Sequence, residues 1–304
     1  MTTQNEQYDI VIAKGRVMET ETNFDGIRNV GIKAIAVVLM AAAIFAGFGQ
    51  RAHAQQAGGI VIDLPEVRNY VALAAGVVPD YMGSDDYTAG VAPAGLVKFG
   101  SSERFARLLV TELSVNALDS RNWRLGPVLN YRLARDDVDD AVVNRMRDID
   151  GTFEGGVFGG WTWIGDEDPR HRFTTSAQFL HDLGDEHGGY LISASARYFQ
   201  PVTRQLTLSI GTTVTYGSSP YMQTYFGVDS NNAARSGLSQ FGAGSGVRDV
   251  RIPFMAIYSL SPKWHLAGGL IYSRILGDAS DSPIVDQRGS SNQLFAGLGI
   301  ARAW

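Results

Sequence analysis

The sequence contains no cysteine, which excludes disulfide bonds and cysteine-ligated metal sites. Charge is also scarce: charged residues make up 19% of the chain, and a net charge of −5 disfavours a nucleic-acid partner. Beyond residue 55, no apolar run approaches the roughly 20 residues of a membrane-spanning helix. Glycine, by contrast, is abundant, with 35 residues in a chain of 304. This balance favours an all-β protein that passes unfolded through an oxidising compartment.

The first 54 residues contain the parts of a secretory signal peptide. Basic residues precede an apolar run from Ala34 to Phe48, and an A-x-A sequence ends at Ala54. We therefore assign residues 27–54 to a signal peptide that is cleaved between Ala54 and Gln55. Residues 1–26 are interpreted as extraneous to the protein, either as a fusion scar or as the result of a misassigned start codon.

The mature chain, residues 55–304, alternates apolar residues with small or polar ones over segments of about ten residues, the length of a membrane-spanning strand. In RQLTLSIGTTVTY, one face collects Leu206, Leu208, Ile210, Val214 and Tyr216. The other face collects glycine, serine, threonine and glutamine. A period of two residues is typical of β-strands.

Two β architectures fit alternation. A soluble sandwich has strands of about 5–6 residues and turns its apolar face inward. A transmembrane barrel has strands of about 9–11 residues and turns its apolar face to lipid. Long segments, a polar second face and aromatic residues at segment ends, such as Trp264 and Tyr272, favour the barrel. The predicted fold class is an all-β, transmembrane, antiparallel up-and-down β-barrel in the outer membrane of a Gram-negative bacterium.

Loop lengths orient this barrel, because periplasmic turns are short and outer loops are long. QPVTR (200–204) and LSPKW (260–264) are short turns, so residues 218–240 between two of the strands lie outside. The segments give eleven strands, whereas an even number is expected. Either RFARLLVTELSVNAL makes two short passes or one upstream segment does not span the membrane. We predict about 12 strands, with about 10 as the alternative.

Five stretches, in order along residues 65–304, form a recognisable set. They are GVVPDYMGSDDY (76–87), RLGPVLNYRLARDD (124–137), YMQTYFGV (221–228), GDASDSPIV (277–285) and GSSNQ (289–293). This set resembles the MltA-interacting protein / OmpV family (MipA/OmpV). The resemblance implies an outer-membrane scaffold that joins a lytic murein transglycosylase to a peptidoglycan synthase. A small-solute porin-like channel or a surface adhesin is the alternative function.

The partners expected from this reading are outer-membrane lipid and lipopolysaccharide, the barrel-assembly machinery and the two murein enzymes. The last strand ends on an aromatic residue, Trp304, which resembles the signal that the assembly machinery reads. No nucleic-acid partner and no cofactor are expected.

No catalytic, cofactor-binding or metal-binding residue is predicted, and the chain is not expected to be an enzyme. No serine lies in a G-x-S-x-G elbow. The acidic cluster at Asp136–Asp140 lacks the glycine and the spacing of a calcium loop, so it is interpreted as a solvated outer loop. The pair His181 and His187 is interpreted as part of a polar loop.

Two groups of residues are candidates for function in the barrel. The first falls on the inward face, where it would line a water-filled lumen and tune ion passage, or form salt bridges inside a closed barrel. Its members are Arg124, Arg132, Glu154, Arg197 and Arg251. The second packs the longest outer loop, as part of an aromatic girdle or folded inward over the lumen. Its members are Tyr221, Tyr225, Phe226 and Gly227, the glycine permitting a bend.

Overall fold

The computed structural model describes residue 64 and residues 67–304. The predicted signal peptide, its cleavage between Ala54 and Gln55, and the segment 1–26 lie outside these described residues. The first strand begins at Asn69, so the barrel occupies nearly all of the described chain.

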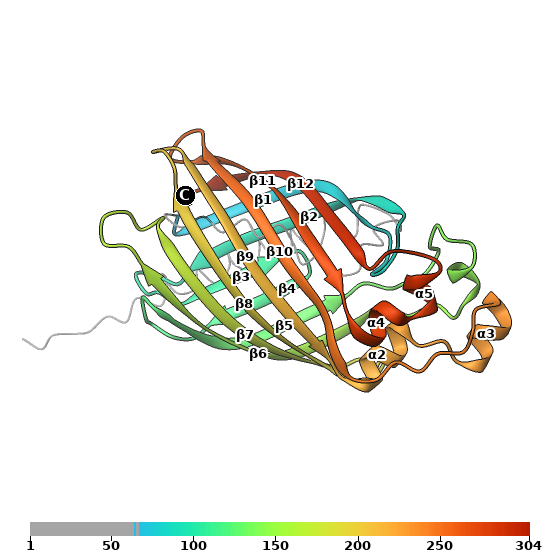
Figure 1. The fold of residues 1–304 in the computed structure, drawn as a ribbon. Helices are drawn as coiled ribbons and strands as arrows, with labels where there is room; N and C mark the ends of the chain where they lie inside the picture. Colours follow the sequence, from blue (N-terminus) through green and yellow to red (C-terminus); the bar gives the residue numbers. More distant parts are fainter. Residues whose placement is uncertain (1–63, 65–66) are drawn as a thin grey trace, which may run out of the picture.

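Twelve antiparallel strands form a closed barrel (Figure 1). Each strand pairs with its neighbours in the chain, and the last strand closes the wall on the first, with Tyr70 opposite Ala303 and Val77 opposite Ala296. The prediction of an all-β barrel with 12 strands is confirmed, and the ten-strand alternative is wrong. The strands are β1 (Asn69–Pro79), β2 (Tyr87–Lys98), β3 (Phe105–Leu109), β4 (Glu112–Asn116), β5 (Trp123–Arg132), β6 (Thr152–Ile164), β7 (Arg172–Asp182), β8 (Tyr190–Pro201), β9 (Leu206–Gly217), β10 (Gly246–Ser259), β11 (Trp264–Ile275) and β12 (Asn292–Ala303).

The alternation in the sequence separates the two faces of this wall. Outward side chains are large and apolar, and Trp123 and Leu298 remain 59% and 75% exposed because their surroundings in a membrane are lipid. Inward side chains are small or polar, as where the Ser195 and Thr213 hydroxyls meet at 2.9 Å. Aromatic residues mark both ends of the outward band. They are Trp123, Trp163 and Trp264 at one end, and Tyr131, Phe153 and Tyr272 at the other.

Strands β3 and β4 are short, with 5 residues each against 12 in β2. The stretch RFARLLVTELSVNAL thus makes two short passes, which turn at Val110 with a left-handed φ of 55°. Because β3 pairs only with Ala94–Lys98, the outer half of β2 has a free edge. On that edge the backbone groups of Ala89 and Val91 face no strand among the described residues.

The two ends of the barrel differ. One end carries short turns and the C-terminus, whereas the other carries long loops with four short helices (Figure 1). The sequence predicted these loops but not their helices, α2 (Ser219–Phe226), α3 (Ser230–Ser236), α4 (Gly277–Asp281) and α5 (Pro283–Asp286), nor the 3₁₀ turn η1 (Val143–Arg145). Across the described part of the chain, no helix has the length and apolar character needed to cross a membrane.

Inward glycines allow the strands to approach closely, and this generates a stability prediction. A Cβ at Gly156 would collide with the backbone carbonyl of Phe179 on β7, whereas one at the outward-facing Gly159 would meet its nearest atom at 3.7 Å. Gly156→Ala is expected to destabilise the barrel by about 1–3 kcal/mol because β6 must shift. The matched control is Gly159→Ala. The stability of both variants is measured by the temperature at which the folded band disappears in heat-modifiability gels. Equal temperatures for the two variants would contradict the expectation.

Candidate functional site

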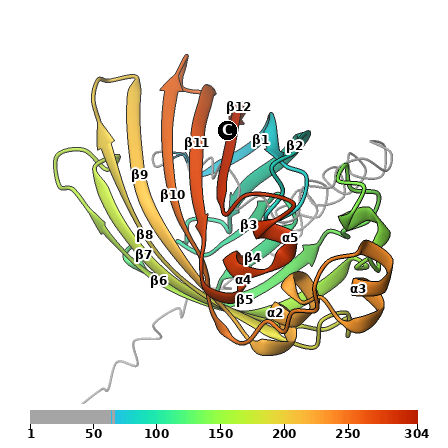
Figure 2. The same ribbon diagram turned by 45° about the vertical axis from the view of Figure 1, so that its right-hand side comes forward.

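Helix α2 closes the outer mouth of the barrel (Figure 2). It begins after Ser218 and carries Pro220 in its first turn, a position where the missing N–H of proline costs no helical hydrogen bond. Its apolar side chains are almost fully buried against inward-facing residues at the outer ends of β7, β8 and β11, so they lie over the lumen and not in the outward girdle. We call these side chains the cap cluster: Tyr221, Met222, Tyr225 and Phe226.

Gly227 ends this helix for a reason that differs from the predicted one. Its φ of −75° and ψ of 151° are open to any residue, so no special bend requires glycine. Space requires it instead, because a Cβ would collide with the carbonyl and the side-chain amide of Gln223. That side chain accepts a hydrogen bond from the Ala243 N–H at 2.9 Å. Gly227 therefore preserves the contact that holds the loop together behind α2.

A buried ion pair lies directly below the cap cluster. Arg132 on β5 and Glu154 on β6 are each 1% exposed, and Arg132 Nη2 lies 2.7 Å from Glu154 Oε1. The same carboxylate accepts a hydrogen bond from the Asn130 amide at 2.8 Å and contacts His187 Nε2 at 3.1 Å. Breaking such a pair by removing one partner is costly, since it leaves an uncompensated buried charge.

The Tyr221 hydroxyl joins this ion pair to the cap cluster. It accepts a hydrogen bond from Arg248 Nη1 at 2.6 Å and another from Arg132 Nη1 at 3.3 Å. The Arg132 guanidinium also lies 5.0 Å from the centre of the Tyr221 ring, within the range of a cation–π contact. One phenol thus links α2 to opposite parts of the wall, β5 and β10.

Strand β10 brings a second set of charges to the mouth through a β-bulge. The pairing with β9 shifts between Val247 and Asp249, which turns Arg248 inward beside its neighbour. Asp249 then accepts from Arg248 Nε at 2.5 Å and from Arg251 Nε at 2.9 Å. A bulge re-aims side chains in this way at the rims of barrels.

Below these charges the lumen contains two cavities in series. The first, of about 260 Å³, is lined by Leu180 and Leu191, which also contact the cap cluster. The second, of about 430 Å³, reaches the short-turn end, where Lys98 and Pro169 line it. Arg107, Glu112 and Gln178 line both cavities.

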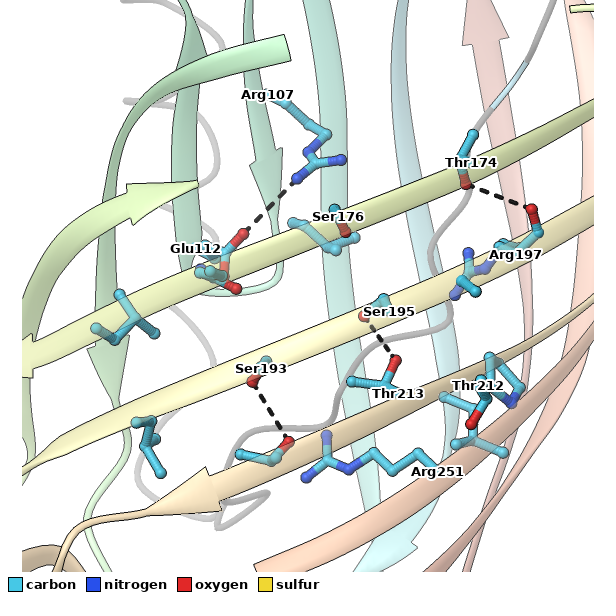
Figure 3. A pocket seen from close by; sticks show the side chains of 18 of the residues that line it. Arg107, Glu112, Thr174, Ser176, Ser193, Ser195, Arg197, Thr212, Thr213 and Arg251 are labelled. Carbon is cyan, nitrogen blue, oxygen red and sulfur yellow. Dashed lines mark hydrogen bonds and ion pairs between the residues drawn. The ribbon is translucent and has the colours of Figure 1, made fainter. Parts of the chain in front are cut away.

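A polar contact across the lumen separates the two cavities. Gln178 on β7 donates to Glu112 at 2.7 Å, and Arg107 lies 3.8 Å from the same carboxylate (Figure 3). Because β3 and β4 are short, the hairpin that carries Arg107 and Glu112 turns back within the wall.

The inward residues singled out in the sequence do not form one group. Arg132 and Glu154 meet below the cap, whereas Arg251 and Arg197 line the first cavity. Arg124 lies near the short turns and donates to the Ser120 carbonyl at 2.5 Å. Sequence reasoning missed three residues of the buried network, His187, Arg248 and Asp249. His187 was assigned to a polar loop, and the bulge turns Arg248 inward against the period of two. Asp249 shares the inward face with Arg251, so the same alternation could have found it.

The predicted acidic outer loop is tied to other outer loops, and the Asp139 N–H donates to Asp80 Oδ2 at 2.9 Å. Asp140 pairs with Arg288 at 2.5 Å and so joins two outer loops. Burial raises the pKa of the Asp140 carboxyl, but hydrogen bonds from Arg288 and from the backbone of Val142 and Val143 outweigh it, so the pKa lies below its usual value. Within the described residues, no group of three or more acidic or histidine side chains is arranged to hold a metal ion.

Removing the Tyr221 hydroxyl is expected to loosen the cap. Tyr221→Phe keeps the ring but deprives two buried guanidinium groups of an acceptor, which costs about 1.5–3 kcal/mol. Cleavage of the 218–245 loop by an added protease should therefore accelerate in the folded barrel. Tyr216→Phe, on the outward face of β9 beside Tyr190, is the matched control. Identical cleavage rates for the two variants would rule out the linking role of this hydroxyl.

Solved structures of similar shape are outer-membrane barrels with little sequence identity. The NanC porin is 10% identical, covers 77% of this chain and 100% of its own, and gives a TM-score of 0.43. The translocator domain of the autotransporter NalP from Neisseria meningitidis is 10% identical, with coverages of 88% and 98% and a TM-score of 0.43. Neither likeness bears on function.

Two relatives are similar in sequence. Outer membrane protein OmpV of Vibrio cholerae is 28% identical over 131 residues, which are 42% of this chain and 48% of that protein. Outer membrane protein Omp26La of Vibrio anguillarum is 27% identical over 129 residues, with the same coverages. The chain thus spans about half the length of these relatives.

A family model covers far more of the chain. The family described as MltA-interacting protein MipA matches residues 71–304, which is almost the whole barrel. This match confirms the resemblance seen in the sequence, and the barrel and its relatives agree on the location. The chain therefore belongs to the MltA-interacting protein MipA family of Gram-negative outer-membrane proteins.

Proposed function

We propose that this protein is a gated conduit for small polar solutes across the outer membrane. The observation that carries the proposal is the lumen itself: two cavities follow each other between the outer mouth and the short-turn end. Serine, threonine and arginine make up about half of the first cavity's lining and recur in the second. A barrel whose only task was to anchor other proteins would gain stability from an apolar packed interior, whereas this one keeps a polar interior with open volume.

The cap cluster supplies the gate in this proposal. It covers the first cavity, yet it is carried by a loop, residues 218–245, whose ends meet where Gly217 pairs with Gly246. The loop therefore has a narrow base on one side of the barrel, from which its helix α2 folds over the lumen. Its release would uncover the cavity while all strand pairs stay intact.

Replacing residues 219–243 by a short glycine-serine linker is expected to produce stepwise currents in planar lipid bilayers, larger than those of the unaltered protein. Gly217 and Gly246 already pair, so the linker fits the hairpin. The matched control carries the same linker in place of the opposite turn, residues 165–171, and should behave like the unaltered protein.

Folding of each variant is checked by heat-modifiability gels before recording. Tyr221→Ala is a second, milder variant, because it removes the side chain that bonds Arg132 and Arg248 but keeps the loop. The conduit proposal fails if neither the folded linker variant nor folded Tyr221→Ala conducts.

A second candidate function is a scaffold for murein enzymes, and the family description favours it. Here the short-turn rim would hold a lytic murein transglycosylase and a peptidoglycan synthase. The connections available on this rim are residues 99–104, 117–122, 165–171, 202–205 and 260–263, so a partner would contact a thin ring. The largest of these by sequence is 165–171, where Asp168 and Arg170 pair at 2.7 Å.

The two linker variants also test the scaffold. The transglycosylase should co-purify with the unaltered barrel and with the variant altered at 219–243, but less with the variant altered at 165–171. Retention by all three, or by none, would contradict a scaffold that uses this turn. The same pair of variants thus distinguishes a conduit gated at the outer mouth from a scaffold that uses the short-turn rim.

We also propose contacts with lipopolysaccharide along the outward band and with the barrel-assembly machinery at β12. The Trp304 N–H donates to the Asn69 carbonyl at 3.1 Å, which places the terminal aromatic at the β1–β12 closure. We further propose that the protein has no catalytic role.

A further inference from the structure

The inward face of the barrel carries positive charge, although the chain as a whole is acidic, with a net charge of −5. Strand pairing and burial place a set of cations on this face: Lys98, Arg107, Arg124, Arg132, Arg172, Arg197, Arg248 and Arg251. The acids on the same face are fewer: Glu112, Glu154, Asp182 and Asp249. The lumen is therefore a region of positive potential inside a negatively charged protein, and anions are attracted to it.

The acids near the mouth are already engaged. Glu154 is held by Arg132 and Asp249 by two arginines, as described above. Asp182 accepts from the backbone N–H groups of His187 and Gly188 at 2.7 and 2.8 Å. Of the acids on the inward face, only Glu112 lines the first cavity. A cation entering this cavity would therefore meet few uncommitted carboxylates.

Arg251 offers a buried donor to the same cavity. The residue is only 8% exposed, and its Nη2 has no hydrogen-bond partner among the residues that the structure describes. Its Nε is fixed by Asp249, so the guanidinium is held at one edge while the other edge points into the cavity (Figure 3). Across the cavity, Arg107 Nε is likewise buried without a partner. Buried donors are nearly always satisfied in folded proteins, so two orphans facing one cavity point to a ligand.

The part of the wall next to Arg251 supplies hydroxyl groups, since Thr213 on β9 pairs with Arg251 on β10. Ser195 and Thr213 meet at 2.9 Å, and Ser193 and Thr215 at 3.4 Å, on the faces of β8 and β9 that line the cavity. Hydroxyl groups both donate and accept, so they suit the oxygen atoms of a small polar solute. The volume of about 260 Å³ lies below that of pockets for drug-sized ligands, roughly 300–1,000 Å³, which restricts the solute to a small molecule.

We propose that the first cavity is a binding site for small oxyanions, solutes with a carboxylate or phosphate group, anchored by Arg251 with Arg107 facing it. A planar guanidinium whose free edge presents N–H donors matches the geometry of such groups. The proposal deepens the conduit function and rests on it for transport, but binding itself requires only the cavity. The site selects anions over cations before they reach the crossing at Arg107, Glu112 and Gln178.

Anion binding is tested first, by a measurement that does not require the barrel to conduct. Isothermal titration of the detergent-folded protein with inorganic phosphate and, separately, with gluconate should give saturable heat for at least one. The two anions distinguish a phosphate site from a carboxylate site. Arg251→Gln is expected to weaken this binding several-fold, and Arg107→Gln provides a second variant if the first does not fold. Arg235→Gln, on the exposed surface of α3, is the matched control and should bind like the unaltered protein.

Selectivity is tested next, from the reversal potential of the linker variant at 219–243 in a potassium chloride gradient. Anion preference that falls several-fold on adding Arg251→Gln supports the proposal. A conducting barrel without anion preference, or equal binding by the Arg251→Gln and Arg235→Gln variants, overturns it and leaves the conduit standing. A barrel that binds anions but never conducts overturns the conduit and leaves the binding site.

Discussion

The bilayer offers no hydrogen-bond partners to a polypeptide backbone, and most of this structure follows from that constraint. A wall of strands satisfies its own backbone only when its last strand returns to its first, as β12 does to β1. Closure then divides every strand into a face for lipid and a face for the lumen. Only the outward face must be apolar, so the inward face is free to carry the charges from which a site is built.

Those charges and the cap depend on each other. Arg132 and Glu154 are removed from water, and their attraction offsets that cost only where further hydrogen bonds complete the network. The phenol of Tyr221 completes it from a loop that lies about ninety residues away in the chain. The outer mouth is thus closed by a polar contact as well as by apolar packing. An outer loop whose Tyr221 hydroxyl lies between two arginines has a defined closed position. Bonds from Arg135 to the Tyr225 carbonyl and from Ser282 to the Phe226 carbonyl reinforce that position.

The sequence determined the wall far better than the mouth. Strict alternation in β9 or β11 follows from a local fact, the different surroundings of the two faces, so the wall and inward residues such as Arg251 could be predicted from it. The alternating segments alone gave eleven strands, and the rule that such barrels have an even number led to twelve. The helix α2 has 8 residues, too few to show a helical period, so only its aromatic content marked it. Arg248 was missed because a bulge breaks the alternation at that point. The partnership of Tyr221 with two strands depends on the register of the whole barrel, which no local pattern contains.

The short β3–β4 hairpin has a consequence for the membrane around the protein. Along the outer half of β2, the backbone groups of Ala89 and Val91 face the surroundings without a strand partner among the described residues. Hydrocarbon cannot satisfy such groups, whereas water and lipid headgroups can. We therefore expect water and lipid headgroups to reach this edge of β2, so that the polar layer of the membrane lies closer to the barrel wall here than elsewhere around it.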